Sequence, residues 1–193
     1  NRNYLATSSN DLTINFWDTH RYQLRQRIPT ADVQMALHWS EPHSKLYSGS
    51  ITGKVHSWDV DTLQQGASMS GQHSDVVMDL HCIPSMEVLT SASLDASICL
   101  WDMASGALRK TLHGHSKGVC SLAYSADYRF LASAGFDHDA VIWNPYVENL
   151  ICRLKGHHSS LVGVELAEHT PEIITADVNG VIKVWDIRNF RCV

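Results

Sequence analysis

The 193-residue sequence has no apolar run of the roughly 18 residues that a membrane-spanning helix needs. Its formal net charge of −5 gives it no general affinity for nucleic acids or acidic membranes. Nucleophile elbows, phosphate-binding loops, dinucleotide fingerprints and EF-hand calcium loops are also missing. We therefore expect no nucleic-acid, membrane or small-molecule partner, no cofactor and no enzymatic activity.

Cysteine and proline are both scarce, with five residues of each. The cysteines are odd in number and scattered along the chain: Cys82, Cys99, Cys120, Cys152 and Cys192. This spacing fits neither a disulfide framework nor a zinc site, so we expect reduced, buried thiols in a cytoplasmic protein. No segment has the apolar period of a long amphipathic helix.

What the sequence does contain is a tandem repeat that ends in a tryptophan followed by Asp or Asn. The five pairs are Trp17-Asp18, Trp58-Asp59, Trp101-Asp102, Trp143-Asn144 and Trp185-Asp186. Their spacings of 41, 43, 42 and 42 residues indicate one supersecondary unit copied along the chain. An array of such units usually offers a surface to partners rather than a reaction chamber.

Three further residue types recur at constant offsets inside the repeat. A histidine lies 28 residues before the tryptophan, a hydroxyl residue 18 after the histidine, and an acid or amide 22 after it. The sets are His73, Ser91, Asp95 and Trp101; His115, Ser133, Asp137 and Trp143; and His157, Thr175, Asn179 and Trp185. A carboxylate can orient an imidazole that bonds a hydroxyl, which meets the indole N–H, so we predict a buried relay. Because the set recurs, a structural role explains it better than repeated hydrolase triads.

These residues, with the pairs Gly114-His115 and Gly156-His157, resemble the WD-repeat β-propeller family over essentially the whole chain. A variant, Gly71-Gln72-His73, opens an earlier unit. The resemblance implies an all-β fold with four antiparallel strands per blade. Short apolar and β-branched runs independently predict four strands in two units. They cover 76–82, 87–91, 97–101 and 108–112 in one unit, and 119–124, 130–134, 140–143 and 150–154 in the next.

The expected architecture is a partial propeller over residues 1–193, with about four and a half four-stranded blades. Its units end near residues 28, 70, 113, 155 and 193. The first unit is the tail of a blade, since 5–9 matches a second strand. We expect the segment to be part of a seven-bladed ring, which at ~42 residues per blade needs roughly 300 residues. A closed ring of five blades is the alternative.

Two units depart from the repeat pattern. In the second unit Thr30 stands in the place of the histidine and Thr52 in that of the acid, while Ser48 and Trp58 remain. We therefore expect packing to be the main support of this blade. In the last unit Asn179 takes the place of the acid, where an amide still accepts a hydrogen bond but carries no charge.

The residue before each relay acid is the most informative position for partner binding. The family resemblance places it on a tight turn at the narrower face of the propeller. The five residues are Asn10, Ile51, Leu94, Phe136 and Val178. Turn tips usually carry polar residues, so four apolar tips predict a docking patch, with packing against the neighbouring blade as the alternative. Two residues after each histidine, Asp75, Lys117 and Ser159 are candidate polar contacts.

Two histidine-containing segments offer side chains of the types that bind metal ions. Asp137-His138-Asp139 and His113-Gly114-His115 have ligand-like composition. Asp137 and His115 both belong to the relay, however, and the first segment has the composition of a tight turn. We therefore expect no metal site.

Two local sequences bear on function. The stretch 157–193, which contains a Thr-Ala-Asp segment and Trp185-Asp186-Ile187-Arg188, resembles WD-repeat proteins of motile cilia, some of which carry EF-hands. The resemblance implies a non-catalytic scaffold in the ciliary axoneme that contacts tubulin or neighbouring ciliary proteins. The same Trp185-Asp186-Ile187-Arg188 matches a W-D-x-R sequence by which some WD-repeat substrate receptors engage a cullin ubiquitin-ligase adaptor. A ubiquitin-ligase substrate receptor is therefore the alternative function.

Overall fold

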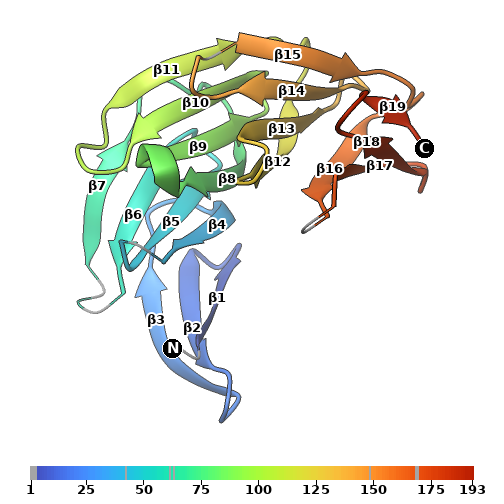
Figure 1. Ribbon diagram of the computed structural model, residues 1–193. Helices are drawn as coiled ribbons and strands as arrows, with labels where there is room; N and C mark the ends of the chain where they lie inside the picture. The colour runs from blue at the N-terminus through green and yellow to red at the C-terminus, as the bar shows by residue number, and fades with distance from the viewer. Residues whose placement is uncertain (1–3, 42, 61, 63, 148, 168–169) are drawn as a thin grey trace.

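The computed structural model describes residues 4–41, 43–60, 62, 64–147, 149–167 and 170–193. These residues form five antiparallel sheets that are arranged as the blades of an open arc (Figure 1). Within these ranges the helical element is a 3-10 turn, η1 (Pro84–Met86), and no helix has the length and apolarity that crossing a bilayer demands. The all-β propeller segment predicted from the repeat is confirmed.

Each blade consists of strands that pair with their neighbours in the chain. Blade 1 has β1 (Tyr4–Ser9), β2 (Thr13–Asp18) and β3 (Gln23–Pro29). Blade 2 has β4 (Gln34–Ser40), β5 (Lys45–Ser50), β6 (Val55–Asp59) and β7 (Gln65–Met69). Blade 3 has β8 (Val77–Ile83), β9 (Val88–Ser93), β10 (Ser97–Asp102) and β11 (Leu108–His113). Blade 4 has β12 (Val119–Ser125), β13 (Phe130–Gly135), β14 (Ala140–Asn144) and β15 (Asn149–Leu154). Blade 5 has β16 (Leu161–Leu166), β17 (Glu172–Asp177), β18 (Ile182–Asp186) and β19 (Arg191–Cys192).

A recurring irregularity gives the blades a common shape. In blades 2 to 5 the register of the first two strands shifts at the same place, for example between Val119 and Ser121. In blades 2 to 4 the third and fourth strands shift beside the repeated tryptophan, for example between Ile142 and Trp143, and β2 and β3 of blade 1 do the same. An extra residue bends a strand and increases its twist. The repeated shifts therefore help to give successive sheets the same twisted form.

The hydrophobic core lies between the blades. Four clusters of buried side chains each combine residues from two neighbouring blades. At the junction of blades 3 and 4, for example, Leu100 and Ile98 belong to one cluster with Leu122 and Val141. In a sheet that is covered on both faces, the residues along a strand are buried continuously instead of alternately. All six residues of β9 and of β13 are buried in this way. Each blade therefore depends on its neighbours for stability.

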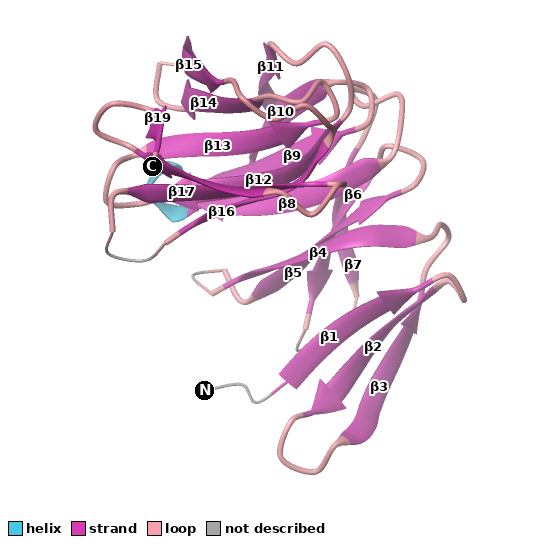
Figure 2. Ribbon diagram, turned by 90° about the vertical axis from the view of Figure 1, so that its right-hand side faces the viewer, coloured by secondary structure: helices cyan, strands magenta, loops and turns pink. Residues whose placement is uncertain are grey.

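The two end blades do not meet. Among the described strands, β1 pairs with β2 alone and β19 with β18 alone. Blade 1 and blade 5 lie at opposite ends of the arc in Figure 1, and they are also well separated in Figure 2. The chain does not form the closed ring of five considered from the sequence, and the seven-bladed ring remains a prediction.

Candidate functional site

The relay of blade 3 joins four side chains into one chain of hydrogen bonds. The Nδ1 atom of His73 lies 3.0 Å from Oδ2 of Asp95, and its Nε2 atom lies 2.7 Å from Oγ of Ser91. The indole N–H of Trp101 donates to the same hydroxyl over 2.8 Å. Burial opposes ionisation of Asp95, but hydrogen bonds from Ser97 hold the pKa of this carboxyl below its usual value. The imidazole side chain is fully buried, so the relay ties the segment before β8 to β9, β10 and the turn between them.

Blade 4 repeats the same arrangement. His115 lies 2.8 Å from Asp137 through Nδ1 and 2.7 Å from Ser133 through Nε2, and Trp143 donates to Ser133 over 2.8 Å. Burial lowers the pKa of His115, although the neighbouring Asp137 carboxylate opposes this. The imidazole is therefore neutral at pH 7, with Nδ1 donating to the carboxylate and Nε2 accepting from the hydroxyl.

Blade 5 builds the relay with a different acid from the one predicted. His157 lies 2.8 Å from Oδ2 of Asp177 and 2.8 Å from Oγ1 of Thr175, which accepts the indole N–H of Trp185 over 2.8 Å. The prediction that Asn179 occupies the acid position is wrong. Its side-chain amide instead donates to Oγ of Ser159 over 2.6 Å, outside the relay.

The reason for this exchange is steric. Asp177 has the same place in its strand pair as Gly135 in blade 4, since Leu161 pairs with Asp177 and Val119 with Gly135. A side chain at Gly135 would run into Nδ1 of His115 and a carboxylate oxygen of Asp137. In blade 5 the carboxylate of Asp177 fills that space directly. An acid two residues before the expected position, together with an amide at that position, was the sequence signal that could have found it.

Blade 2 keeps a polar bridge in spite of lacking the histidine. The hydroxyl of Ser48 donates to Oε1 of Gln34 over 2.7 Å and accepts the indole N–H of Trp58 over 2.7 Å. The amide nitrogen of Gln34 donates to the carbonyl of Asp32 over 2.7 Å. The expectation that packing is the main support of this blade therefore needs correction. Counting residues back from the tryptophan did not identify Gln34, because Gln34 lies on β4, beside the strand of Ser48, and not at a position of the relay.

The four apolar tips behave differently from one another. They form the tip face, which we define as the turns that join the second and third strands and carry Ile51, Leu94, Phe136 and Val178. Ile51 is 42% and Val178 59% exposed, whereas the other two are half-buried. A Cβ at Gly118 in blade 4 would lie 2.9 Å from Cδ2 of Leu94, so this tip packs against the next blade. The alternative of packing against the neighbouring blade therefore holds for Leu94, whereas Ile51 and Val178 remain exposed and the docking patch stays a prediction.

The candidate polar contacts also lie at this end of the blades. Asp75 and Lys117 are exposed, and Ser159 is half-buried beside Asn179. The tip residue of blade 4, Phe136, accepts a hydrogen bond at its carbonyl from the hydroxyl of Ser160 in blade 5 over 3.1 Å. At this junction blade 5 therefore supports the tip turn of blade 4.

Comparison with known proteins gives the repeats a family. The model for the family described as WD domain, G-beta repeat matches residues 64–102, 106–144 and 148–186, more than half of the chain. The chain belongs to the WD-repeat family. The matched ranges contain the repeated tryptophans of blades 3, 4 and 5.

Curated relatives resemble this WD-repeat segment along nearly its whole length. Cilia- and flagella-associated protein 337 B of Tetrahymena thermophila is 32% identical over 96% of this chain and 16% of its own length. Periodic tryptophan protein 2 homolog of Dictyostelium discoideum is 25% identical over 94% of this chain and 20% of its own. Protein FIZZY-RELATED 3 of Arabidopsis thaliana is 24% identical over 96% and 37% respectively. The segment therefore spans well under two thirds of each relative.

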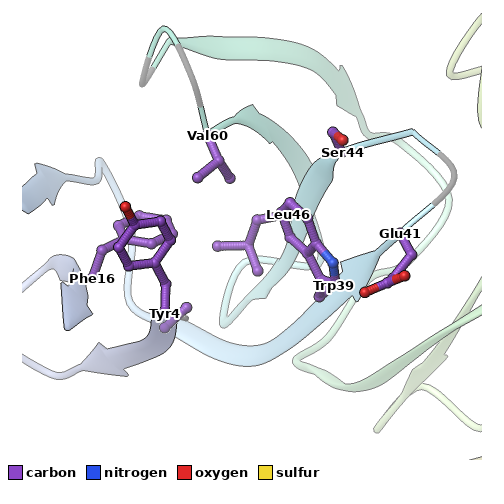
Figure 3. Close-up of a pocket in the computed structure, with 8 residues that line it drawn as sticks. Tyr4, Phe16, Trp39, Glu41, Ser44, Leu46 and Val60 are labelled. Carbon is purple, nitrogen blue, oxygen red and sulfur yellow. The ribbon is translucent and has the colours of Figure 1, made fainter. Parts of the chain in front are cut away.

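At the end of the blades opposite the tip face, hollows lie between neighbouring sheets. One, of about 330 Å³, lies between blades 1 and 2. Tyr4 and Phe16 face Trp39, Leu46 and Val60 across it (Figure 3). Ala6 also lines this hollow, and it pairs with Phe16, the residue before the repeated tryptophan. In blade 2 the residue that pairs with the position before the tryptophan is Tyr47, and its side chain is fully buried. The small side chain of Ala6 thus leaves unfilled the volume that a tyrosine fills one blade later.

The W-D-x-R segment lies at this same end of blade 5. The guanidinium of Arg188 donates from Nε to Oδ1 of Asp186 over 2.9 Å and from Nη2 to Oδ2 over 2.5 Å. The Arg188 side chain is 73% exposed, and its hydrogen bond holds the pKa of Asp186 below its usual value. In this structure the arginine is thus engaged with a neighbour in its own turn.

The cysteines follow the sequence expectation only in part. All five are free thiols, and burial raises the pKa of Cys82 to about 12. Cys99 is buried as well, but Cys120 and Cys152 are half-buried and Cys192 is exposed. The expectation of buried thiols is therefore wrong for Cys192, which lies in the short final strand β19. A raised thiol pKa makes a cysteine less reactive.

Proposed function

We propose that this WD-repeat segment is a non-catalytic, protein-binding scaffold of the ciliary axoneme. WD repeats indicate a protein-interaction scaffold. The observation that carries the ciliary part is the 32% identity to a cilia- and flagella-associated protein over 96% of the chain. The proposed partners are proteins, with tubulin and neighbouring axonemal components as the first to test.

The absence of a catalytic role is part of the same proposal. The hydroxyls that resemble nucleophiles, those of Ser91 and Ser133, belong to residues with no exposed surface. Each already accepts an indole N–H and bonds an imidazole. A substrate would have to open the blade to reach them. The His-hydroxyl-Asp sets therefore support scaffolding, and the exposed turns are left to contact partners.

The tip face is the proposed docking surface for an axonemal protein. Ile51 and Val178 are its most exposed apolar tips, and the exposed charged residues Asp75 and Lys117 lie two residues after the histidines of blades 3 and 4. Exposed apolar side chains with charged residues around them are typical of protein-binding patches. Leu94 and Phe136 support the shape of the surface from half-buried positions.

The localisation experiment uses the full-length protein with an epitope tag in ciliated cells. Detergent extraction of isolated cilia separates the axoneme from the soluble matrix and membrane. We expect the tagged protein to stay with the axoneme and to co-purify with axonemal proteins. Full release into the detergent fraction, or absence from cilia, would overturn the ciliary proposal. Co-purification of a cullin adaptor that is lost in Arg188→Ala would instead support the ubiquitin-ligase receptor.

A second experiment tests the docking surface itself. The full-length double variant Ile51→Asp with Val178→Asp places two carboxylates among the exposed tips without touching the relays. We expect at least a tenfold loss of axonemal co-purification at unchanged thermal stability. Tyr22→Asp is the matched control, because Tyr22 is 86% exposed and lies in the turn between β2 and β3, at the other end of the blade. Unchanged co-purification of the double variant would remove the tip face from the proposal.

A further inference from the structure

A second hollow opens at the junction of blades 4 and 5, at the end of the sheets opposite the tip face. It has a volume of about 520 Å³. Tyr124 and Tyr128 line it from blade 4, and Leu166, Ile187 and Glu165 line it from blade 5, with His81 reaching in from blade 3. The turns that join the first and second strands border it, whereas the tips lie in turns at the other end of the second strand.

Small side chains keep this junction open. In each blade a residue of the first strand pairs with a residue of the second strand beside the junction. The pairs are His38 with Tyr47, His81 with Thr90 and Ala123 with Ala132 in blades 2, 3 and 4. The imidazole of His38 and the ring of Tyr47 fill the space between blades 2 and 3, where Tyr47 is fully buried. Ala123, whose small side chain lines the hollow, leaves the corresponding volume between blades 4 and 5 unfilled.

The neighbouring junction of blades 3 and 4 is closed in another way. The hydroxyl of Tyr146 lies 2.8 Å from that of Ser85 and 3.0 Å from that of Tyr124, so the three side chains bridge the two blades. Tyr124 is thereby fixed, and it also forms a wall of the open hollow. A wall held by hydrogen bonds is preorganised for a ligand, which reduces the entropy lost on binding.

The charged residues that line the hollow are acidic, and two arginines, Arg129 and Arg188, lie near its tyrosine walls. Glu165 and Asp127 line it, and no lysine or arginine is among the described lining residues. Burial lowers the pKa of His81, so this imidazole is neutral at pH 7. A third carboxyl group, that of Asp79, lies outside the lining but close enough to Glu165 to interact with it, and burial together with this neighbour raises its pKa. Arg188, the residue after Ile187, is bound by Asp186.

We propose that this hollow binds an arginine side chain from a basic segment of a partner protein. A guanidinium can stack on the tyrosine rings while its donors pair with the Glu165 carboxylate, a combination that a flat cation with several donors satisfies best. Leu166 and Ile187 offer apolar surface to the methylene stem. The inference rests on the proposed scaffold function and adds the chemistry of one partner, at a face distinct from the tips.

The test uses the full-length protein and a fluorescein-labelled peptide of alternating glycine and arginine, with binding measured by fluorescence anisotropy. Two further peptides replace arginine by lysine or by citrulline, which keeps the shape of arginine but lacks its charge. We expect the arginine peptide to bind at least tenfold more tightly than the citrulline peptide. Glu165→Gln should weaken arginine binding about tenfold, and Tyr128→Leu should weaken it several-fold.

The matched control is Glu41→Gln, which removes the same charge from the other hollow, between blades 1 and 2. We expect this variant to bind the arginine peptide as the unmodified protein does. Equal binding of the citrulline peptide, an unaffected Glu165→Gln variant, or an equal loss in Glu41→Gln would each overturn the inference. Failure here leaves axonemal co-purification and its dependence on Ile51 and Val178 unchanged, so the two proposals fail separately.

Discussion

Blades 4 and 5 contain the same imidazole, hydroxyl and indole, but they take the carboxylate from different residues. In blade 4 Asp137 reaches back from the turn to His115, and Gly135 leaves the space beside the imidazole open. In blade 5 the position of Gly135 is held by Asp177, whose own carboxylate meets the imidazole. The relay therefore needs a carboxylate at one point in space, and two sequence positions can supply it.

In blade 2 the imidazole itself is replaced by another side chain. There Gln34 from the first strand accepts from Ser48, which bonds Trp58 as in the other blades. The hydroxyl and the indole are the common elements, and their partner is replaceable. A buried hydroxyl and a buried indole N–H both need hydrogen-bond partners, whichever residue provides them. The variants below test how strictly each blade needs its own solution.

The largest expected effect comes from Gly135→Asp, which gives blade 4 both carboxylates. The new Cβ would collide with His115 and Asp137, and two carboxylates would compete for one imidazole. We expect a loss of roughly 3 kcal/mol in the free energy of unfolding, measured by urea denaturation. Gly163→Ala is the control, because a Cβ there meets no atom within 4 Å.

Adding Asp137→Asn to Gly135→Asp converts blade 4 to the arrangement of blade 5. We expect the double variant to recover a large part of the lost stability, since one carboxylate then faces the imidazole. A double-mutant cycle measures this coupling directly. Strictly additive losses would show that the two positions are not equivalent in space.

The next effect concerns the replacement in blade 2. Gln34→Leu removes the acceptor of the Ser48 hydroxyl from a site where Gln34 is 3% exposed. We expect a loss of roughly 1 to 2 kcal/mol, because a buried polar group is left without its partner. Gln23→Leu, at an exposed position of β3, should be close to neutral. If the two variants unfold alike, packing alone supports blade 2.

A smaller effect is expected from pH. Burial places the folded-state pKa of His115 below the unfolded value of about 6.5. The unfolded chain therefore binds more protons just below pH 6.5, so this contribution is complete above that pH and declines as the pH falls below it. We expect the free energy of unfolding to be lower at pH 5 than at pH 7, and His115→Gln to reduce the difference. An unchanged pH dependence in the variant would contradict the assignment.

The smallest effect separates the two polar residues of the blade 5 turn. Asn179→Ala removes an exposed amide whose bond to Ser159 lies outside the relay, so we expect a change within about 0.5 kcal/mol. Asp177→Asn should lower the melting temperature clearly, since the neutral amide replaces the carboxylate that meets His157. The reverse ranking, measured by thermal unfolding, would restore Asn179 as the relay residue.

Much of the site geometry could be predicted because it is set by fixed offsets. A strand pair joined by a short turn places residues across from each other according to their distance along the chain. His73 and His115 therefore meet the hydroxyl and acid at the predicted offsets. Offsets could not find Asp177 or Gln34, because those contacts depend on which neighbouring position is empty and on which strand lies alongside.

The exposure of the tips and the hollow between blades depend on the neighbouring blade, which fixed offsets within one repeat do not describe. Four apolar tips predicted one patch, yet Leu94 packs against Gly118 while Ile51 and Val178 remain exposed. The side chain of a tip residue is covered or left open by the blade beside it, and sequence spacing within one repeat does not contain that neighbour. The hollow between blades 4 and 5 was missed for the same reason. It lies where the small side chain of Ala123 in one blade faces Leu166 in the next.

Spacing along the chain was enough to predict the repeat, the four strands of the complete blades, and the hydroxyl-to-indole bonds of blades 3, 4 and 5, because these depend on residues close together in one unit. Contacts between strands and between blades set the acid of blade 5, the amide of blade 2, the exposed tips and the acidic hollow. Each of these depends on the volume left between side chains of different strands or different blades. In close-packed sheets that volume is set by both surfaces together, so one repeat read alone cannot specify it.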